Sequence, residues 1–168
     1  RLVSVMEWPI PQYFKPLKKV LEKDAAAVLL ITDEGTLSSL ETWAESLQGR
    51  SGYVNESSLT KKSLSLSDFT WNHTTLWGLK SDPTITYLQA GFSPTEYLSQ
   101  IESIKEKFGD EVYLHFEWMK NNGQIVPSSL PIINYRSEER LYEIVEYMES
   151  MEIQVFEPHT WIVDDRGG

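Results

Sequence analysis

The sequence of 168 residues contains no cysteine, which excludes disulfide scaffolds and thiolate metal sites. It also lacks a long apolar run, because the longest one, Ala25–Ile31, is far too short to cross a bilayer. Basic residues are few, with 15 Lys and Arg against 25 Asp and Glu and a net charge of −10. Nucleic acids and anionic membranes are bound by clustered Lys and Arg. We therefore expect no nucleic-acid partner and no integral membrane segment.

Several motifs of catalytic and binding sites are missing as well. The sequence has no Gly-rich phosphate loop, no GxSxG and no HExxH. Asp164 and Asp165 have no second group of ligands nearby in the sequence, so we predict no metal site. No signal peptide is visible, and we expect a cytoplasmic location. The chain starts inside a predicted strand and ends at two glycines, so we expect it to be a fragment of a longer protein.

The length predicts one domain with a substantial core, covering residues 1–168. Its first half, residues 1–66, predicts the order β-α-β-α. Alternation and proline positions place a strand at Arg1–Trp8, and helical spacing places a helix at Tyr13–Lys23. The apolar run Ala25–Thr32 predicts a central strand buried on both faces. Leu40, Trp43, Ala44 and Leu47 have the spacing of a second amphipathic helix.

The second half, residues 67–168, carries the clearest fold signals. After a helix over about 67–79 come a strand at Thr84–Ala90, a helix introduced by the capping box 93–96, a hairpin around 121–123, a helix capped by Ser137 and a strand at Ile153–Phe156. The order β-α-β-β-α-β is typical of the ferredoxin-like, or split β-α-β, arrangement. We predict an α+β fold with an antiparallel sheet and helices on one face. The first half could be a degraded copy of the same unit.

Strand alternation brings candidate catalytic groups together in the hairpin. Along Glu111–Met119, the side chains of Tyr113, His115 and Glu117 share one face, which we expect to be open because the helices cover the other. An imidazole and a carboxylate two residues apart can act as a base and the group that orients it. The alternatives are a solvated sheet face or a subunit contact.

Two further places offer ring and polar side chains. His159 follows the last strand, in a predicted loop, where it could accept a proton or cap a turn. Trp71, Asn72 and His73 offer a stacking ring, an amide and an imidazole within the predicted helix 67–79. A helix does not place Trp71 and His73 on one face, so a structural role for part of this group is the alternative.

Four segments of the sequence resemble the carboxy-terminal half of FAD-linked oxidases, in the vanillyl-alcohol oxidase and p-cresol methylhydroxylase superfamily. They are FTWNHTTLWGLKSDPTITYLQ (Phe69–Gln89), FGDEVYLHFEW (Phe108–Trp118), LPIINYRSEERL (Leu130–Leu141) and FEPHTWIVDDRGG (Phe156–Gly168). The resemblance implies a substrate-binding cap domain, which covers the ring of FAD and shapes the substrate pocket. It also implies that most of the FAD lies in another domain of the same chain.

By this resemblance the parent protein oxidises a small alcohol or 2-hydroxy acid by hydride transfer to FAD. The expected catalytic residues are His115, Glu117 and His159, and the expected cofactor-binding residues are Trp71, Asn72 and His73. Its partners are then the FAD-binding domain and a small-molecule substrate. Two other functions stay open: a non-catalytic ferredoxin-like domain that binds a ligand through the open sheet face, or a domain that forms homo-oligomers through it.

Overall fold

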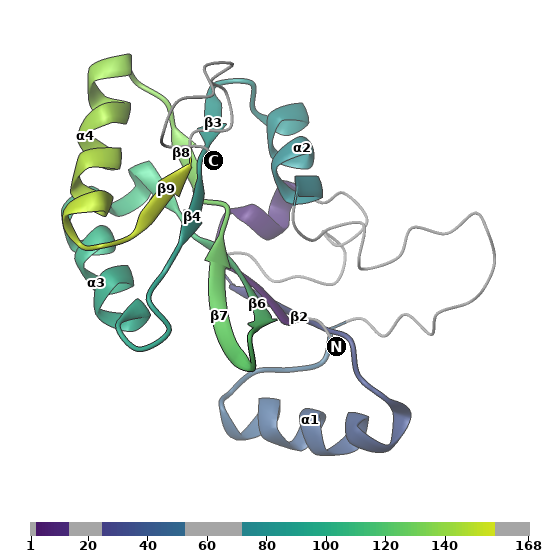
Figure 1. Cartoon of the computed structure of the whole chain (residues 1–168). Coiled ribbons are helices and arrows are strands. Elements are labelled where there is room, and N and C mark those ends of the chain that lie inside the picture. The colour runs from purple at the N-terminus through teal and green to yellow at the C-terminus, as the bar shows by residue number, and fades with distance from the viewer. Residues whose placement is uncertain (1–2, 14–24, 53–71, 157–168) are drawn as a thin grey trace.

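The computed structural model describes residues 3–13, 25–52 and 72–156 (Figure 1). Its elements in the first half are β1 (Val3–Met6), the 3-10 helix η1 (Ile10–Tyr13), β2 (Ala27–Leu30) and α1 (Glu34–Ser46). The elements of the second half are α2 (Asn72–Ser81), β3 (Ile85–Tyr87), β4 (Gln89–Gly91), α3 (Tyr97–Phe108), η4 (Gly109–Glu111), β5 (Val112–Tyr113), β6 (His115–Asn121), β7 (Gln124–Ser129), β8 (Ile132–Asn134), α4 (Glu138–Ser150) and β9 (Gln154–Phe156).

The strands form two antiparallel sheets. One sheet has the order β2-β1-β6-β7-β4-β9, and a short one has the order β3-β8-β5. The predicted α+β class with antiparallel pairing is therefore confirmed. The second half has the predicted order β-α-β-β-α-β, except that each of its first three strands is divided in two.

These three divisions produce the short sheet. They fall at Leu88, at Leu114 and at Leu130–Pro131, so that β3, β5 and β8 separate from β4, β6 and β7. Pro131 has no N–H for a ladder hydrogen bond, which accounts for the break in its strand. Hydrogen bonds still cross the bend, because the Leu88 N–H donates to the Pro131 carbonyl at 3.0 Å and the Leu130 N–H to the His115 carbonyl at 3.1 Å.

Local signals in the sequence fix the turns of the second half. Ser93 Oγ accepts from the Glu96 N–H at 3.1 Å ahead of α3, and Ser137 Oγ accepts from the Arg140 N–H at 3.2 Å at the start of α4. Asn122 and Gly123 both have positive φ, 48° and 86°, as a two-residue hairpin loop requires. The capping box is only half as predicted, because the Gln100 amide oxygen, not Glu96, accepts from the Ser93 N–H at 3.1 Å.

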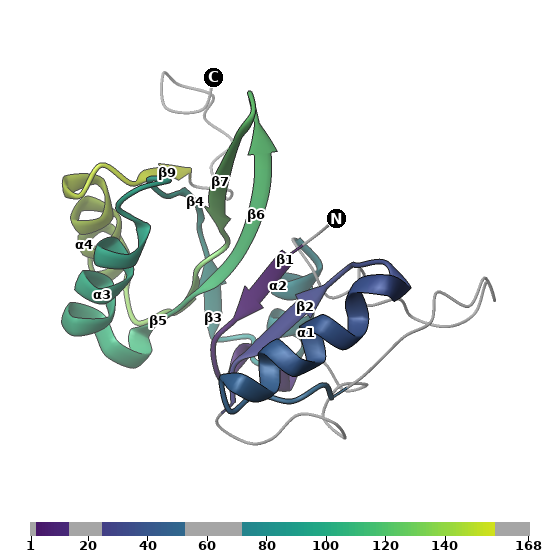
Figure 2. The same cartoon turned by 90° about the horizontal axis from the view of Figure 1, so that it is seen from below.

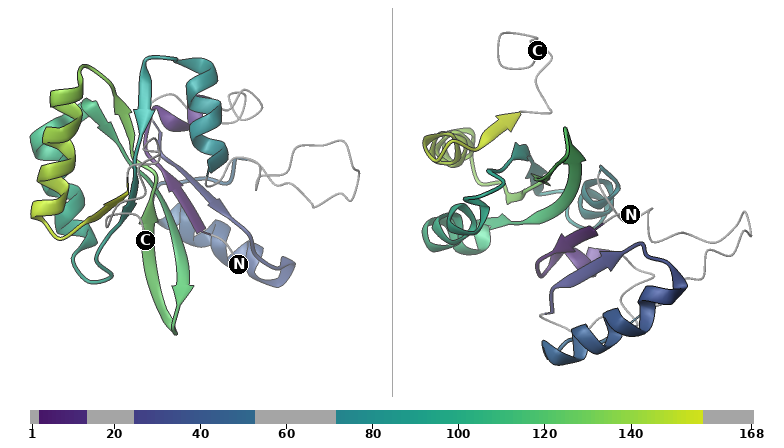
Figure 3. Two further views of the ribbon diagram at one scale, coloured as in Figure 1. Left: turned by 45° about the horizontal axis from the view of Figure 1, so that its top comes forward. Right: turned by 60° about the horizontal axis from the view of Figure 1, so that its bottom comes forward.

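Two cores lie on opposite faces of the short sheet. In β8, Ile133 packs with α3 and α4, whereas its neighbour Ile132 packs with Met6, Ile10 and Ile85 and with Trp77 of α2. The view from below shows α3 and α4 on one side of the strands and α2 on the other (Figure 2), and the two further views agree (Figure 3). The prediction that helices cover only one face is therefore wrong for this sheet.

The first half joins the second through β1. This strand pairs with β2 on one side and with β6 on the other, so β2 is an edge strand (Figure 1). The prediction that Ala25–Thr32 forms a central strand buried on both faces is wrong, because Val28 is 49% exposed. Helix α1 forms as predicted, yet it buries no residue, and its Trp43 is 53% exposed. The predicted helix at Tyr13–Lys23 lies outside the described residues except for Tyr13, which ends η1.

Gly109 provides a test of the chain reversal after α3. Its φ of 51° and ψ of −122° are strained for any residue with a Cβ, although no atom lies within 4 Å of the place where a Cβ would stand. We expect Gly109→Ala to lower the free energy of unfolding by about 1–3 kcal/mol in chemical denaturation. The matched control is Gly35→Ala in the first turn of α1, where alanine should be neutral or mildly stabilising. Equal stability of the two variants would contradict the backbone described here.

Candidate functional site

His115 is the first residue of β6 and lies next to the bend in its strand. Its carbonyl oxygen accepts two hydrogen bonds, from the Leu130 N–H at 3.1 Å and from Ser129 Oγ at 2.8 Å. Both lone pairs of this carbonyl are therefore used, and β7 fixes the backbone that carries the imidazole. The His115 side chain points to the face opposite Phe116, which packs in the core under α3 and α4.

The imidazole contacts two polar side chains through one nitrogen. Nε2 of His115 lies 2.9 Å from Ser4 Oγ and 3.4 Å from Glu117 Oε1. Ser4 comes from β1 and is the register partner of Glu117, so the pairing of β1 with β6 brings these three side chains together. All three are buried, with exposed fractions of 0% for Ser4, 0% for His115 and 4% for Glu117. We call them the Ser4–His115–Glu117 cluster.

The face that carries His115 and Glu117 is covered, and the prediction of an open face is wrong. Strand parity placed both side chains on one face, but both are buried there. Met6 of β1, the register partner of His115, packs with Ile10, Ile85 and Ile132. The pairing of β1 with β6 thus brings Met6 and Ser4 beside these two side chains. A sequence alone does not give this pairing, because it joins residues more than a hundred positions apart.

The cluster has the residue types of a hydrolase triad without its geometry. In such a triad the serine contacts one ring nitrogen and the acid contacts the other, so that the acid orients the base. Here Ser4 and Glu117 share Nε2 of His115. Nδ1 is buried and has no hydrogen-bond partner in the described part of the chain. This arrangement does not support nucleophilic attack by Ser4.

A second buried polar atom is unpartnered among the described residues, the hydroxyl oxygen of Thr75 in α2. Most buried polar atoms in proteins are hydrogen-bonded, so each exception needs a reason, such as a bound molecule or a catalytic role. Sequence reasoning did not single out Ser4, Thr75 or Ser129 as candidate site residues. A small polar residue inside a strand pattern such as VSVM was the one signal that could have singled out Ser4.

The other predicted site residues fall outside this cluster or outside the described residues. Asn72 and His73 lie in the first turn of α2, and nothing is described of their side chains. Trp71 and His159 belong to the segments that are not described. The structure therefore brings together His115 and Glu117, two of the three residues predicted to be catalytic.

Glu111 is the centre of a second charged cluster, at the start of α4. Its carboxylate is 6% exposed, contacts Arg136 Nε at 2.7 Å and accepts from the Arg140 guanidinium. The hydrogen bond from Arg140 holds the pKa of Glu111 below its ordinary value, against the effect of burial. Arg140 also donates to Glu143. Because every charge here has an opposite partner, this cluster serves to join η4 to α4.

Lys105 makes a third polar connection, between α3 and the chain after β1. Its ammonium donates to Glu7 Oε1 at 2.7 Å and to the carbonyls of Gly109 and Val112 at 2.9 and 3.0 Å. Burial raises the pKa of Glu7, and the hydrogen bond from Lys105 opposes that rise. All three donors of Lys105 are used, which leaves none for a ligand.

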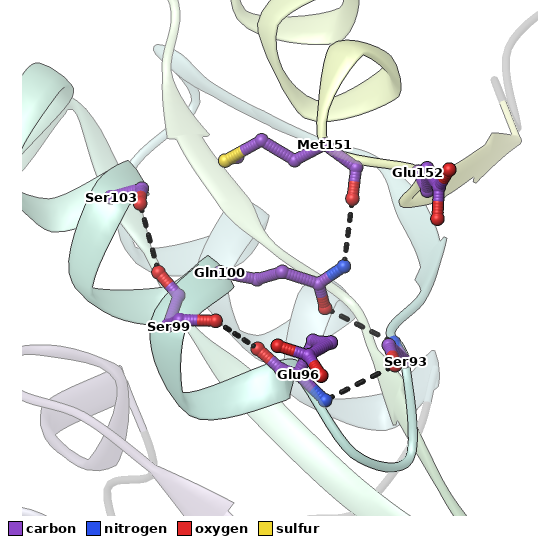
Figure 4. A pocket seen from close by; sticks show the side chains of 7 residues that line it. All are labelled: Ser93, Glu96, Ser99, Gln100, Ser103, Met151 and Glu152. Carbon is purple, nitrogen blue, oxygen red and sulfur yellow. Dashed lines mark hydrogen bonds between the residues drawn. The ribbon is translucent and has the colours of Figure 1, made fainter.

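Two shallow hollows lie on the surface of the second half, and neither borders the Ser4–His115–Glu117 cluster. The larger, of about 260 Å³, lies between α3 and the end of α4 and is lined by Ser93, Glu96, Ser99, Gln100, Ser103, Met151 and Glu152 (Figure 4). Its hydroxyls donate along the helix, Ser99 to the Glu96 carbonyl and Ser103 to the Ser99 carbonyl. The Gln100 amide donates to the Met151 carbonyl at 2.9 Å, so this hollow is a helix contact.

No metal centre is present in the described part of the chain, where no three His, Cys, Asp or Glu side chains gather to hold an ion. Among the described helices, none has the length and apolar character needed to cross a membrane. In comparison with known proteins, the chain matches no family model and no curated protein.

The Glu111 cluster predicts a pH-dependent contribution to stability. Glu111→Gln should lower the free energy of unfolding at pH 7 by about 1.5–3 kcal/mol, the range for hydrogen bonds to charged groups. A carboxyl whose pKa is lowered in the folded state stabilises above its ordinary pKa, and this stabilisation is lost as the pH falls through the lowered value. The difference between wild type and variant should therefore shrink below about pH 4.5.

Denaturant unfolding from pH 7 to pH 3 measures this difference. Glu143→Gln is the matched control, because Glu143 is half-exposed at the edge of the same cluster and should contribute under about 1 kcal/mol. A Glu111 effect that stays constant down to pH 3 would show that the charge of this carboxylate does not stabilise the fold.

Proposed function

We propose that this chain is the substrate-binding cap domain of an FAD-dependent oxidoreductase that oxidises a small alcohol or a 2-hydroxy acid. The observation that carries the proposal is the buried Ser4–His115–Glu117 cluster, with its unpartnered Nδ1. An alcohol that loses a hydride to a flavin also loses its hydroxyl proton, and an imidazole oriented by a carboxylate is suited to accept that proton.

Burying these three polar side chains costs free energy that a purely structural core could avoid. A buried carboxylate beside an imidazole loses hydration, and apolar side chains of similar volume are often as stable or more stable. Phe116, between His115 and Glu117 in β6, fills the opposite core without polar atoms. The polar pair therefore points to a role beyond packing, in the part of the sheet that does not contact α3 and α4.

The strand arrangement supports the same proposal. We interpret the order β6-β7-β4-β9, with α3 and α4 on one face, as a ferredoxin-like unit, in which the first and third strands would be central. β1 and β2 extend this unit to six strands. A large antiparallel sheet built on ferredoxin-like units is what the resemblance to FAD-linked oxidases implies for a cap domain.

Only part of the FAD site is assigned to this chain. No described residue belongs to a Gly-rich loop that could bind the pyrophosphate of FAD. We therefore propose that the FAD-binding domain of the same parent chain binds it. FAD, when bound there, supplies the hydride acceptor. The residues of this chain bind and orient the substrate, exclude water and hold a proton at His115, with Trp71, Asn72, His73 and His159 as further proposed site residues.

The burial of the cluster favours a second candidate function. Neither surface hollow reaches His115, which is fully buried. A non-catalytic ferredoxin-like domain, which binds a ligand or a second copy of itself elsewhere on its surface, is consistent with this observation. In that case the cluster would join β1 to β6 and have no chemical role.

The absorption spectrum of the full-length parent protein separates the two candidates. We expect the protein, purified without added cofactor, to show the visible bands of oxidised flavin, and we expect lactate or another small 2-hydroxy acid to bleach them. A proton acceptor contributes about 100-fold to 10,000-fold to a rate. Glu117→Gln removes the carboxylate that orients the acceptor His115, so it should slow the bleaching while the flavin stays bound.

Glu143→Gln serves as the control, since this half-exposed residue belongs to α4, which packs on the face of the sheet opposite the Ser4–His115–Glu117 cluster, and it should leave the bleaching unchanged. A colourless parent that also takes up no added FAD would overturn the proposal and favour the non-catalytic domain.

A further inference from the structure

The larger surface hollow, between α3 and the end of α4, presents hydroxyl oxygens that can only accept a further hydrogen bond (Figure 4). Ser99 Oγ donates to the Glu96 carbonyl at 2.8 Å, and Ser103 Oγ donates to the Ser99 carbonyl at 2.9 Å. A hydroxyl group has one hydrogen and two lone pairs, so each oxygen has used its hydrogen and keeps its lone pairs. Both serines therefore act as acceptors toward a molecule that enters the hollow.

Gln100 fixes the two sides of this hollow to each other. Its amide oxygen accepts from the Ser93 N–H at 3.1 Å before α3, and its amide nitrogen donates to the Met151 carbonyl at 2.9 Å after α4. The side chain is 5% exposed, so it lies at the base of the hollow. The hollow, of about 260 Å³, is therefore held in shape before any ligand enters, which lowers the entropy cost of binding.

Two carboxylates complete the lining, Glu96 just before α3 and Glu152 in the turn after α4. Both residues are exposed, and neither carboxylate has an ion-pair partner among the described residues. By contrast, Glu7, Glu111 and Glu143 each contact a lysine or an arginine. No Lys, Arg or His is found among the described residues that line the hollow. The hollow therefore carries an uncompensated negative charge.

The start of α3 offers no site for an anion. Ser93 Oγ accepts from the Thr95 N–H at 3.3 Å and from the Glu96 N–H at 3.1 Å, and the Tyr97 N–H donates to the Ser93 carbonyl at 3.1 Å. A metal ion fits no better, because no three His, Cys, Asp or Glu side chains gather in the part of the chain that the structure describes. Acceptors that are spread over two elements suit a ligand with several N–H donors.

We propose that this hollow binds an organic cation, a guanidinium or primary ammonium group carried on an aliphatic stem. Guanidinium offers five N–H donors and ammonium three, and neither group accepts a hydrogen bond. Glu96 and Glu152 supply the opposite charge, Ser99 and Ser103 supply further acceptors, and the thioether of Met151 offers an apolar contact for the stem. The proposal goes beyond the proposed function and does not rest on it, because the hollow does not border the Ser4–His115–Glu117 cluster.

Titration of the full chain with n-butylguanidine, followed by amide NMR, tests the proposal. We expect saturable shifts of the Gln100 side-chain amide and of the backbone amides of Ser99, Ser103 and Glu152. The matched probe is butyltrimethylammonium, which has the same stem and charge but no N–H donor. It should bind about tenfold more weakly, since hydrogen bonds to charged groups are lost. Equal affinity for the two probes, or shifts spread over the other glutamates of α3 and α4, would overturn the proposal.

Charge-neutralising variants test whether the two carboxylates hold the cation. Glu96→Gln and Glu152→Gln should each weaken the binding of n-butylguanidine about twofold to fivefold, the range for exposed ion pairs. Glu102→Gln is the matched control, because Glu102 is an exposed carboxylate of α3 outside the lining. All three positions are exposed, so the fold should persist in each variant. Unchanged affinity in both lining variants, or an equal loss in the control, would contradict the site.

The same cationic group could come from a free small molecule or from a side chain of a partner protein. The capped peptide acetyl-Gly-Arg-Gly-amide distinguishes these sources in the same titration. Binding of the peptide as tight as that of n-butylguanidine would support the site and assign it to an arginine of a partner protein. Binding of n-butylguanidine alone would support the site and assign it to a free cation. Saturable shifts with neither probe would overturn the proposal.

Discussion

The pairing of β1 with β6 is the interaction on which the rest of the structure depends. It joins the first half of the chain to the second, through the register Ser4–Glu117, Val5–Phe116 and Met6–His115. Directly after β1, the Glu7 N–H donates to the Leu114 carbonyl at 3.1 Å, and the Glu7 carboxylate contacts Lys105. The same pairing brings the side chains of the Ser4–His115–Glu117 cluster together, so the fold and the candidate site depend on one interaction.

The three polar clusters of the chain differ in how completely they are satisfied. Glu111 faces two guanidinium groups, and Lys105 uses all its donors. Both clusters therefore have a sufficient explanation in joining secondary-structure elements. His115 alone among these centres keeps a ring nitrogen without a partner in the described part of the chain. A buried polar atom without a hydrogen-bond partner lowers the stability of the fold, and such costs are found at functional sites. The proposed function is therefore based on His115.

Local signals made the elements of the second half predictable from sequence. The pairing of strands that lie far apart in the sequence was not predictable in this way. Ser137 and Asn122–Gly123 act within a few residues of themselves, and each lies at the start or end of an element where predicted. Strand parity likewise placed His115 and Glu117 together. The pairing of β1 with β6 was not predictable, because β1 lies more than a hundred residues before β6. The place of β2 at the edge was not predictable either, because an apolar run has the same pattern in an edge strand as in a central one.

Native-state amide hydrogen exchange of β1 and β6 tests most directly whether the pairing of these strands holds the Ser4–His115–Glu117 cluster together. If β1 is held on β6 as described, the hydrogen-bonded amides of Val3–Met6 and of His115–Glu117 exchange with one common free energy, close to that of global unfolding. The contradicting result is rapid exchange of the β1 amides while β6 and β7 stay protected. In that case β1 would leave the sheet readily, and Ser4 could not hold the ring of His115.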